Sequence, residues 1–311
     1  MKRFLDYLHR GPCPCAAYTA LAGYIFLIIA RIIDATCSNT IVLRLMPPVF
    51  SLLIFVLPLG IYLALYRKSF SKASLRITLP SLSHLPIVLT AALTLILGGT
   101  LLTILLYGNA VNASAFSLYE TFTTQIHSGF GGNLYLVLVY ALLPAVCEEL
   151  VYRALMCAEY QKSGVLCAIA MSSLLFGMLH FDMRFLLLYV VSGAFLAITM
   201  YATKTVIVPM LLHFIYNLFC IYIRPYVISF YVNTASRALF IMITVPLFLI
   251  CTALFCCFAG RQYNKYSEQG ITASYPTALS PTQNVEALEQ AFVSLPFILC
   301  AIIFVVAGIV F

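Results

Sequence analysis

Two adjacent glutamates lie in an apolar part of this chain. Glu148 and Glu149 come just after the segment LYLVLVYALLPAV and shortly before Arg153. A charged side chain at the centre of a bilayer costs about 2.5–3.5 kcal/mol on insertion scales, so such a residue usually serves a function. On a helix, Glu149 and Arg153 share one face, whereas Glu148 is turned about 100° away. The spacing predicts that Glu149 pairs with Arg153 and leaves the Glu148 carboxylate for chemistry.

Two histidines and an asparagine lie in later apolar stretches. His180 ends the run SSLLFGMLH, and His213 and Asn217 lie within PMLLHFIYNLF. Phe176 shares a helical face with His180, as His213 does with Asn217. A carboxylate near an imidazole can take a proton from water, and imidazole and amide N–H groups can stabilise the oxyanion of an attacked carbonyl. These residue types therefore favour a hydrolase with a shared polar pocket.

Other reactive side chains carry weaker signals. Cys147 is a rival nucleophile beside the glutamates, but its helical face differs from that of Glu148. The eleven cysteines have neither zinc-finger nor disulfide-framework spacing, so each is expected to be a small buried residue. The Cys13-x-Cys15 pair is also compatible with acylation or metal binding. His127 is expected to be an ordinary loop residue.

The composition is that of a membrane protein. Hydrophobic residues make up 63% of the 311 residues, charged residues make up 9%, and the mean hydropathy is +1.03. Soluble domains carry about 25% charged residues. A helix needs about 20 apolar residues to cross a bilayer core of about 30 Å. The sequence therefore predicts an all-α, polytopic transmembrane helical bundle of about eight to nine spans.

Hydropathy also predicts where the spans lie. The expected spans are 16–33, 47–66, 86–107, 134–158, 164–181, 185–201, 205–223, 237–259 and 291–311. The fifth and sixth are joined by few residues, which favours a tight hairpin or a strong tilt. We divide the chain into N-terminal helices with an external loop or interfacial helix (1–133), a catalytic helical core (134–223) and C-terminal helices with a cytoplasmic linker at 260–290 (224–311).

The basic residues predict the orientation. With the N-terminus inside, eleven Lys and Arg residues of the loops lie on the inner side and five on the outer side. This asymmetry favours a cytoplasmic N-terminus. The expected location is a prokaryotic plasma membrane, in which the protein is an integral, multi-pass protein. The net charge of +7 is spread over short loops. A nucleic-acid partner is not expected, because it requires a clustered basic face.

Three short motifs follow one another in a fixed order. They are EExxxR (Glu148, Glu149, Arg153), FxxxH (Phe176, His180) and HxxxN (His213, Asn217). Over roughly residues 134–222, this order resembles the CAAX protease and bacteriocin-processing (CPBP) family of intramembrane proteases, which includes the type II CAAX prenyl proteases. The resemblance implies an endopeptidase in which Glu148 and His180 activate water. It further implies that His213 and Asn217 hold the oxyanion, while Glu149, Arg153 and Phe176 support the site.

The resemblance leaves the substrate and the cofactor open. Eukaryotic members remove the tripeptide after a prenylated cysteine, whereas prokaryotic members are linked to peptide maturation, bacteriocin immunity or surface-protein handling. The expected partners are the lipid bilayer and a peptide or protein substrate, lipidated or membrane-associated. Glu148, His180 and His213 could form a zinc site. However, Asn217 is a poor zinc ligand and the chain has no HExxH motif, so metal-free hydrolysis is favoured.

A non-enzymatic function is the alternative. The same polar pocket suits a proton-coupled carrier, or a scaffold or bacteriocin-immunity protein that has kept the motifs. Transporters usually show inverted repeats and helices broken at the midplane. Pro144 precedes the glutamates and Pro209 precedes His213, but the sequence shows no internal repeat. The protease is therefore the preferred prediction.

Overall fold

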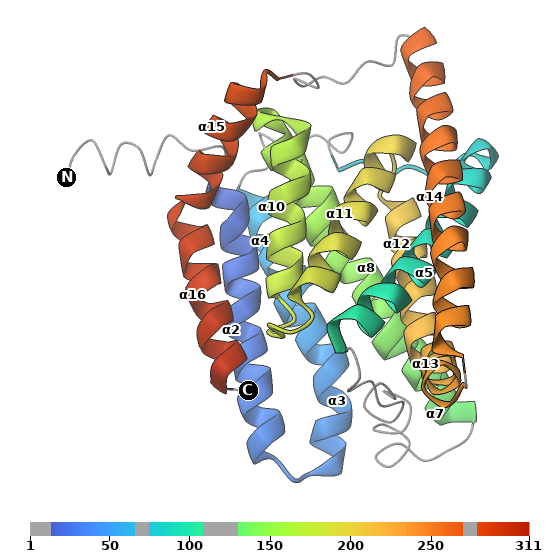
Figure 1. Ribbon diagram of the computed structural model, residues 1–311. Helices are drawn as coiled ribbons and strands as arrows, with labels where there is room; N and C mark the ends of the chain where they lie inside the picture. Colours follow the sequence, from blue (N-terminus) through green and yellow to red (C-terminus); the bar gives the residue numbers. More distant parts are fainter. Residues whose placement is uncertain (1–13, 66–74, 108–129, 235, 270–278, 311) are drawn as a thin grey trace.

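The computed structural model describes residues 14–65, 75–107, 130–234, 236–269 and 279–310, and within these ranges its regular structure is entirely helical (Figure 1). Seven helices of this part are long and apolar enough to cross a membrane. There are eight spans if the bent pair α15 and α16 is counted as one, with its 63° bend. The predicted polytopic helical bundle is confirmed.

The helices follow in one order along the chain. The α-helices are α2 (Pro14–Thr36), α3 (Thr40–Ser51), α4 (Leu57–Leu65), α5 (Leu85–Tyr107), α7 (Phe130–Tyr135), α8 (Leu143–Glu149), α9 (Cys157–Tyr160), α10 (Val165–Met178), α11 (Leu186–Thr203), α12 (Ile207–Leu218), α13 (Arg224–Asn233), α14 (Arg237–Glu268), α15 (Pro281–Phe292) and α16 (Leu295–Val310). Between them lie the wider π-helical turns η1 (Leu52–Val56), η5 (Leu136–Leu142), η6 (Leu150–Met156) and η8 (Phe219–Ile223), and the 3₁₀ turns η2 (Leu82–His84) and η7 (Gln161–Ser163).

The predicted linker at 260–290 is wrong for most of its length. Helix α14 continues to Glu268, and α15 covers Pro281–Phe292. Ser280 caps α15 in a capping box with Gln283, and Pro281 occupies the first turn, where a proline needs no N–H. Some of the turn residues that suggested a linker, such as Ser280 and Pro281, thus form the start of helix α15. Of the predicted external loop at 108–133, only the beginning of α7 lies within the described residues.

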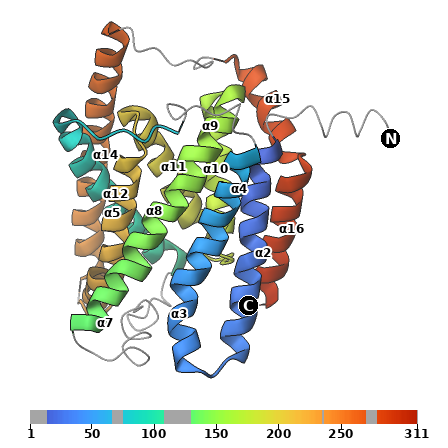
Figure 2. The same cartoon turned by 180° about the vertical axis from the view of Figure 1, so that it is seen from behind.

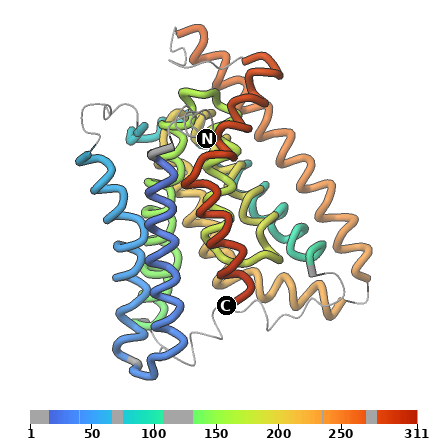
Figure 3. Tube along the Cα trace, turned by 90° about the vertical axis from the view of Figure 1, so that its left-hand side faces the viewer, coloured from blue at the N-terminus to red at the C-terminus, as the bar shows by residue number. Residues whose placement is uncertain are grey.

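Helix pairs from distant parts of the sequence build the bundle. Helix α16 packs against α2, and α14 packs against α5, whereas the consecutive helices α10 and α11 pack against each other (Figures 1 and 2). In the side view of Figure 3, the α2–α3 hairpin and α14 lie at opposite edges of the bundle. The α8, α10, α11 and α12 helices therefore have neighbours on both sides.

Helix α10 is too short to cross the bilayer. It has 14 residues, which span about 21 Å, whereas the bilayer core is about 30 Å thick. The turn between α10 and α11 accordingly ends well before the far ends of α2 and α3 (Figure 1). The expected tight hairpin of the fifth and sixth spans is present, and it holds His180 and Asp182 within the depth of the bundle.

Prolines account for three of the four π-helical turns. The turns η1, η5 and η8 each end two residues before a proline, at Pro58, Pro144 and Pro225 respectively. Proline has no N–H, and its ring clashes with the carbonyl four residues earlier, so the preceding turn widens. No proline follows η6, which carries Arg153. Such wide turns are frequent at functional sites.

Candidate active site

Glu149 connects two helices of the core. Its Oε1 atom lies 3.0 Å from Nη1 of Arg153 and accepts a hydrogen bond from Nδ1 of His213 at 2.9 Å. The side chains of Glu149 and Arg153 are fully buried, and His213 is 7% exposed. The predicted Glu149–Arg153 pair is present, while the bond to His213 was not predicted. Because Nδ1 donates to the carboxylate, a neutral His213 ring has its lone pair at Nε2.

Arg153 has partners on three sides. Besides Glu149, its Nη2 donates to the backbone oxygen of Gly193 at 3.1 Å, and its guanidinium lies 4.2 Å from the centre of the Phe176 ring. A Cβ atom at Gly193 would lie only 3.0 Å from that ring. Gly193 was missed in the sequence, where a glycine in an apolar helix is a weak signal of close packing.

Phe176 is the ring that brings the motifs together. It contacts Tyr152, His180 and His213 edge to face, with ring centres 5.6, 5.2 and 5.8 Å apart respectively. Aromatic pairs in this geometry contribute about 0.5–1.5 kcal/mol each beyond the burial of their area. As expected, the helices that carry the three motifs, α8, α10 and α12, meet at one place.

The end of α10 orients His180. Its backbone N–H bonds to the oxygen of Gly177, so the Phe176 oxygen is free for the His180 ring, whose Nδ1 lies 3.1 Å away. Since a carbonyl only accepts, Nδ1 donates, and a neutral ring has its lone pair at Nε2. Phe181 then takes a left-handed conformation with φ of 51°, which ends the helix.

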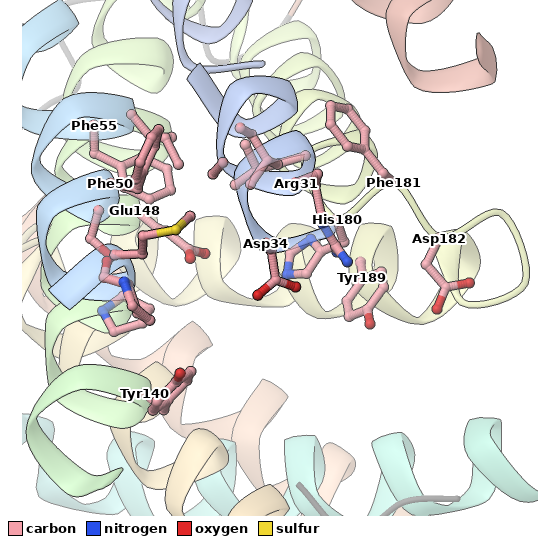
Figure 4. Close-up of a pocket in the computed structure, with 18 of the residues that line it drawn as sticks. Arg31, Asp34, Phe50, Phe55, Tyr140, Glu148, His180, Phe181, Asp182 and Tyr189 are labelled. Carbon is pink, nitrogen blue, oxygen red and sulfur yellow. The ribbon is translucent and has the colours of Figure 1, made fainter. Parts of the chain in front are cut away.

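Two of the predicted catalytic groups line a cavity of about 960 Å³. Glu148 and His180 both line it, and Figure 4 shows them directed into the same space. The other lining residues come from α2, α3, η1, η5, α8, the α10–α11 turn, α11 and α16; they include Arg31, Asp34, Phe50, Phe55, Tyr140, Asp182 and Tyr189. Glu148 is 8% exposed, and its Oε2 atom has no hydrogen-bond partner among the described residues. Glu148 thus lines the cavity with a buried carboxylate oxygen that lacks a hydrogen-bond donor among the described residues.

His213 and Asn217 lie elsewhere than expected. Neither lines the cavity that Glu148 and His180 share. The Nδ1 atom of His213 instead donates to the buried Glu149. Asn217 is half-buried, and its Nδ2 donates to the oxygen of Ala141 in η5 at 3.3 Å. The predicted convergence of four polar groups on one cavity is therefore correct for two of them, and Asn217 instead joins α12 to η5.

The hydrogen bonds of His180 and His213 limit how these residues could bind a zinc ion. Within the described ranges, no group of three His, Cys, Asp or Glu side chains is placed to hold a metal ion. For the zinc alternative of Glu148, His180 and His213, both histidines already donate from Nδ1 to protein oxygens. Only their Nε2 atoms remain as ligands, and these two rings do not line the same cavity.

The remaining sequence candidates separate into described and undescribed residues. Cys147 is 4% exposed. Six of the nine described cysteines are buried, as expected, but Cys256 and Cys257 are exposed on α14, contrary to the prediction. They lie on a helix whose apolar face has few neighbours in the bundle. His127 and the Cys13-x-Cys15 side chains lie outside the described residues.

Comparison with known proteins gives two sequence similarities. Residues 130–219 match the family model for the type II CAAX prenyl endopeptidase Rce1-like group. Over 109 residues the chain is 28% identical to a Bacillus subtilis (strain 168) protein named "Putative membrane peptidase YdiL"; this region is 35% of the chain and 45% of that protein. The chain thus spans less than half the length of this relative, and no solved structure matches it. The matched segment contains all three motifs and the helices that carry them, so this part of the chain is similar to the type II CAAX prenyl endopeptidase Rce1-like group.

Proposed function

We propose that the protein is an intramembrane endopeptidase that hydrolyses peptide bonds with a water molecule activated by Glu148 and His180. The observation that carries the proposal is their placement on one cavity, with the Glu148 Oε2 atom unpaired among the described residues and the His180 ring oriented by the Phe176 oxygen. The family match and the name of the relative support a membrane peptidase.

The proposed reaction starts with a water molecule between the two side chains. Glu148 takes a proton from the water, whose other hydrogen bonds to Nε2 of His180. The oxygen then attacks the peptide carbonyl carbon and forms a tetrahedral intermediate. As the C–N bond breaks, Glu148 passes the proton to the leaving nitrogen, and it returns to its starting state. No metal ion takes part in this sequence.

The layer behind the cavity supports these groups. The Glu149 carboxylate pairs with Arg153 and accepts a hydrogen bond from Nδ1 of His213. The family resemblance implies that His213 donates to an oxyanion, and this role requires a hydrogen on its Nε2 atom as well. An amide has two N–H groups, so Asn217 could keep its bond to Ala141 and offer the second one. Both roles require the substrate to reach beyond the cavity, because neither residue lines it.

The cavity favours a membrane-associated peptide as substrate. Its wall combines apolar side chains such as Phe50 and Phe55 with the charged groups of Arg31 and Asp34 near the end of α2. An extended backbone could place its scissile carbonyl at Glu148 and its flanking residues along this wall. We further propose that the protein resides in a prokaryotic plasma membrane with its N-terminus in the cytoplasm. Whether the substrate is lipidated is a separate question for the experiment.

Peptide cleavage by the purified protein tests the proposal. The wild type and Glu148→Ala, both in detergent, are incubated with a peptide library that includes lipidated and unmodified members, and the products are identified by mass spectrometry. Cleavage at defined bonds by the wild type, absent in Glu148→Ala, is the expected result. A folded wild type that cleaves no member would overturn the protease assignment and favour the carrier or scaffold alternative.

A further inference from the structure

The His180 ring is held on its face as well as at its nitrogen. Its centre lies 3.8 Å from that of the Tyr189 ring, with 10° between the two planes. Both rings line the cavity, as Figure 4 shows for the labelled side chains. Tyr189 comes from α11, so the stack connects the end of one helix to the first turn of the next.

One hydrogen bond alone does not fix an imidazole. The bond from Nδ1 to the Phe176 oxygen sets one distance, but rotation about Cα–Cβ and Cβ–Cγ can still tilt the ring while that bond is kept. A parallel stack sets the plane of the ring. Together the two contacts determine the direction of the lone pair on Nε2. In the proposed reaction, Nε2 is the atom that faces the water molecule.

Tyr189 is itself well placed for this task. Its backbone N–H bonds to the oxygen of Phe185 at 3.0 Å, and the Phe185 ring contacts it edge to face at 6.4 Å. It lies four residues before Gly193 and therefore on the same face of α11. Gly193 accepts the hydrogen bond from Arg153. One face of α11 thus contacts both His180 and the buried ion pair.

We infer that Tyr189 is a positioning residue for His180 and that its ring, rather than its hydroxyl group, performs this role. The part of this inference that concerns catalytic rate rests on the proposed hydrolase. The part that concerns the orientation of His180 does not, so the two can fail separately.

The experiment uses Tyr189→Phe, which keeps the stack, and Tyr189→Leu, which removes it. The full-length proteins in detergent are treated with diethyl pyrocarbonate, which acylates unprotonated histidine, and acylation of each histidine is followed by mass spectrometry. We expect the Leu variant to be acylated at His180 about three- to tenfold faster than the wild type, the fold-change that corresponds to the loss of one aromatic pair. The Phe variant should match the wild type. His84 is the internal reference, because its partners are Ser81 and Tyr266 and neither changes.

Turnover is measured on the same three proteins with a peptide cleaved by the wild type. The Leu variant should lose about three- to tenfold in kcat with little change in KM, and the Phe variant should keep both. If Leu does not fold, Tyr189→Met replaces it. Equal acylation of His180 in the wild type and the aliphatic variant would overturn the inference, as would a Phe variant that behaves like Leu. If the wild type cleaves nothing, the proposed hydrolase function is wrong. The acylation rates still test the role of Tyr189 in that case.

Discussion

Nδ1 of His213 lies 2.9 Å from Oε1 of Glu149, so a histidine of α12 and a carboxylate of α8 share one buried hydrogen bond. Arg153 approaches the same oxygen at 3.0 Å. The second motif glutamate is therefore joined to two positively charged or protonatable groups, whereas Glu148 faces the cavity. Adjacent residues of one sequence motif thus have different environments. Substitutions of Glu148 and Glu149 should therefore affect different properties of the protein.

Replacing Glu149 should chiefly destabilise the protein. Glu149→Gln leaves the Arg153 charge buried without its counterion, and breaking a buried pair in this way costs about 3–5 kcal/mol. We expect a lower yield and a lower midpoint of thermal unfolding in detergent. Glu286→Gln is the control, because Glu286 is exposed on α15. An unchanged midpoint for Glu149→Gln would contradict the structural role of the pair.

Replacing Glu148 should abolish turnover and leave the fold intact. Glu148→Gln keeps the size of the side chain, and the Oε2 atom has no partner to lose among the described residues. The unfolding midpoint should match the wild type, while peptide cleavage falls below detection. Normal cleavage by a well-folded Glu148→Gln would rule out a carboxylate base at this position.

Gly193→Ala should disturb the buried ion pair. The added Cβ atom would lie 3.0 Å from Phe176 Cδ1 and 3.3 Å from Arg153 Nη2. Alanine favours a helix by about 1 kcal/mol over glycine, but overpacking costs about 1–3 kcal/mol, so we expect net destabilisation. Gly60→Ala is the matched control, because a Cβ atom there meets nothing within 4 Å. Thermal unfolding of both variants gives the comparison, and a Gly193→Ala as stable as Gly60→Ala would contradict the predicted clash.

Exhaustive chelation should leave peptide cleavage intact. The proposed reaction uses a carboxylate base, and the histidines of the site donate from Nδ1 to protein oxygens. Added zinc should inhibit if it binds the remaining Nε2 atoms. The measurement is the metal content of the purified protein beside its activity before and after chelation. Stoichiometric zinc, with activity lost on chelation and restored by zinc alone, would replace the metal-free mechanism with a zinc hydrolase.

Local features of the site could be predicted from the sequence. The pairing of Glu149 with Arg153 depends only on a helical spacing of four residues, and the separate direction of Glu148 depends on the same geometry. Most of the spans follow from the length of each apolar run, but the predicted span 164–181 does not, because α10 is too short to cross the bilayer. The predictions that hold need no information about which helices are neighbours.

The contacts between helices could not be obtained in this way. The bonds from His213 to Glu149 and from Asn217 to Ala141 join residues 64 and 76 positions apart. The stack of Tyr189 on His180 depends on the tight turn that follows the short helix α10. Hydropathy shows that a side chain is buried, but it does not show which buried group will satisfy it. Tertiary packing alone decided that Glu148 and His180 line the cavity while His213 bonds to Glu149 and Asn217 bonds to Ala141, since the partner of a buried polar group depends on the donor or acceptor that the neighbouring helix presents.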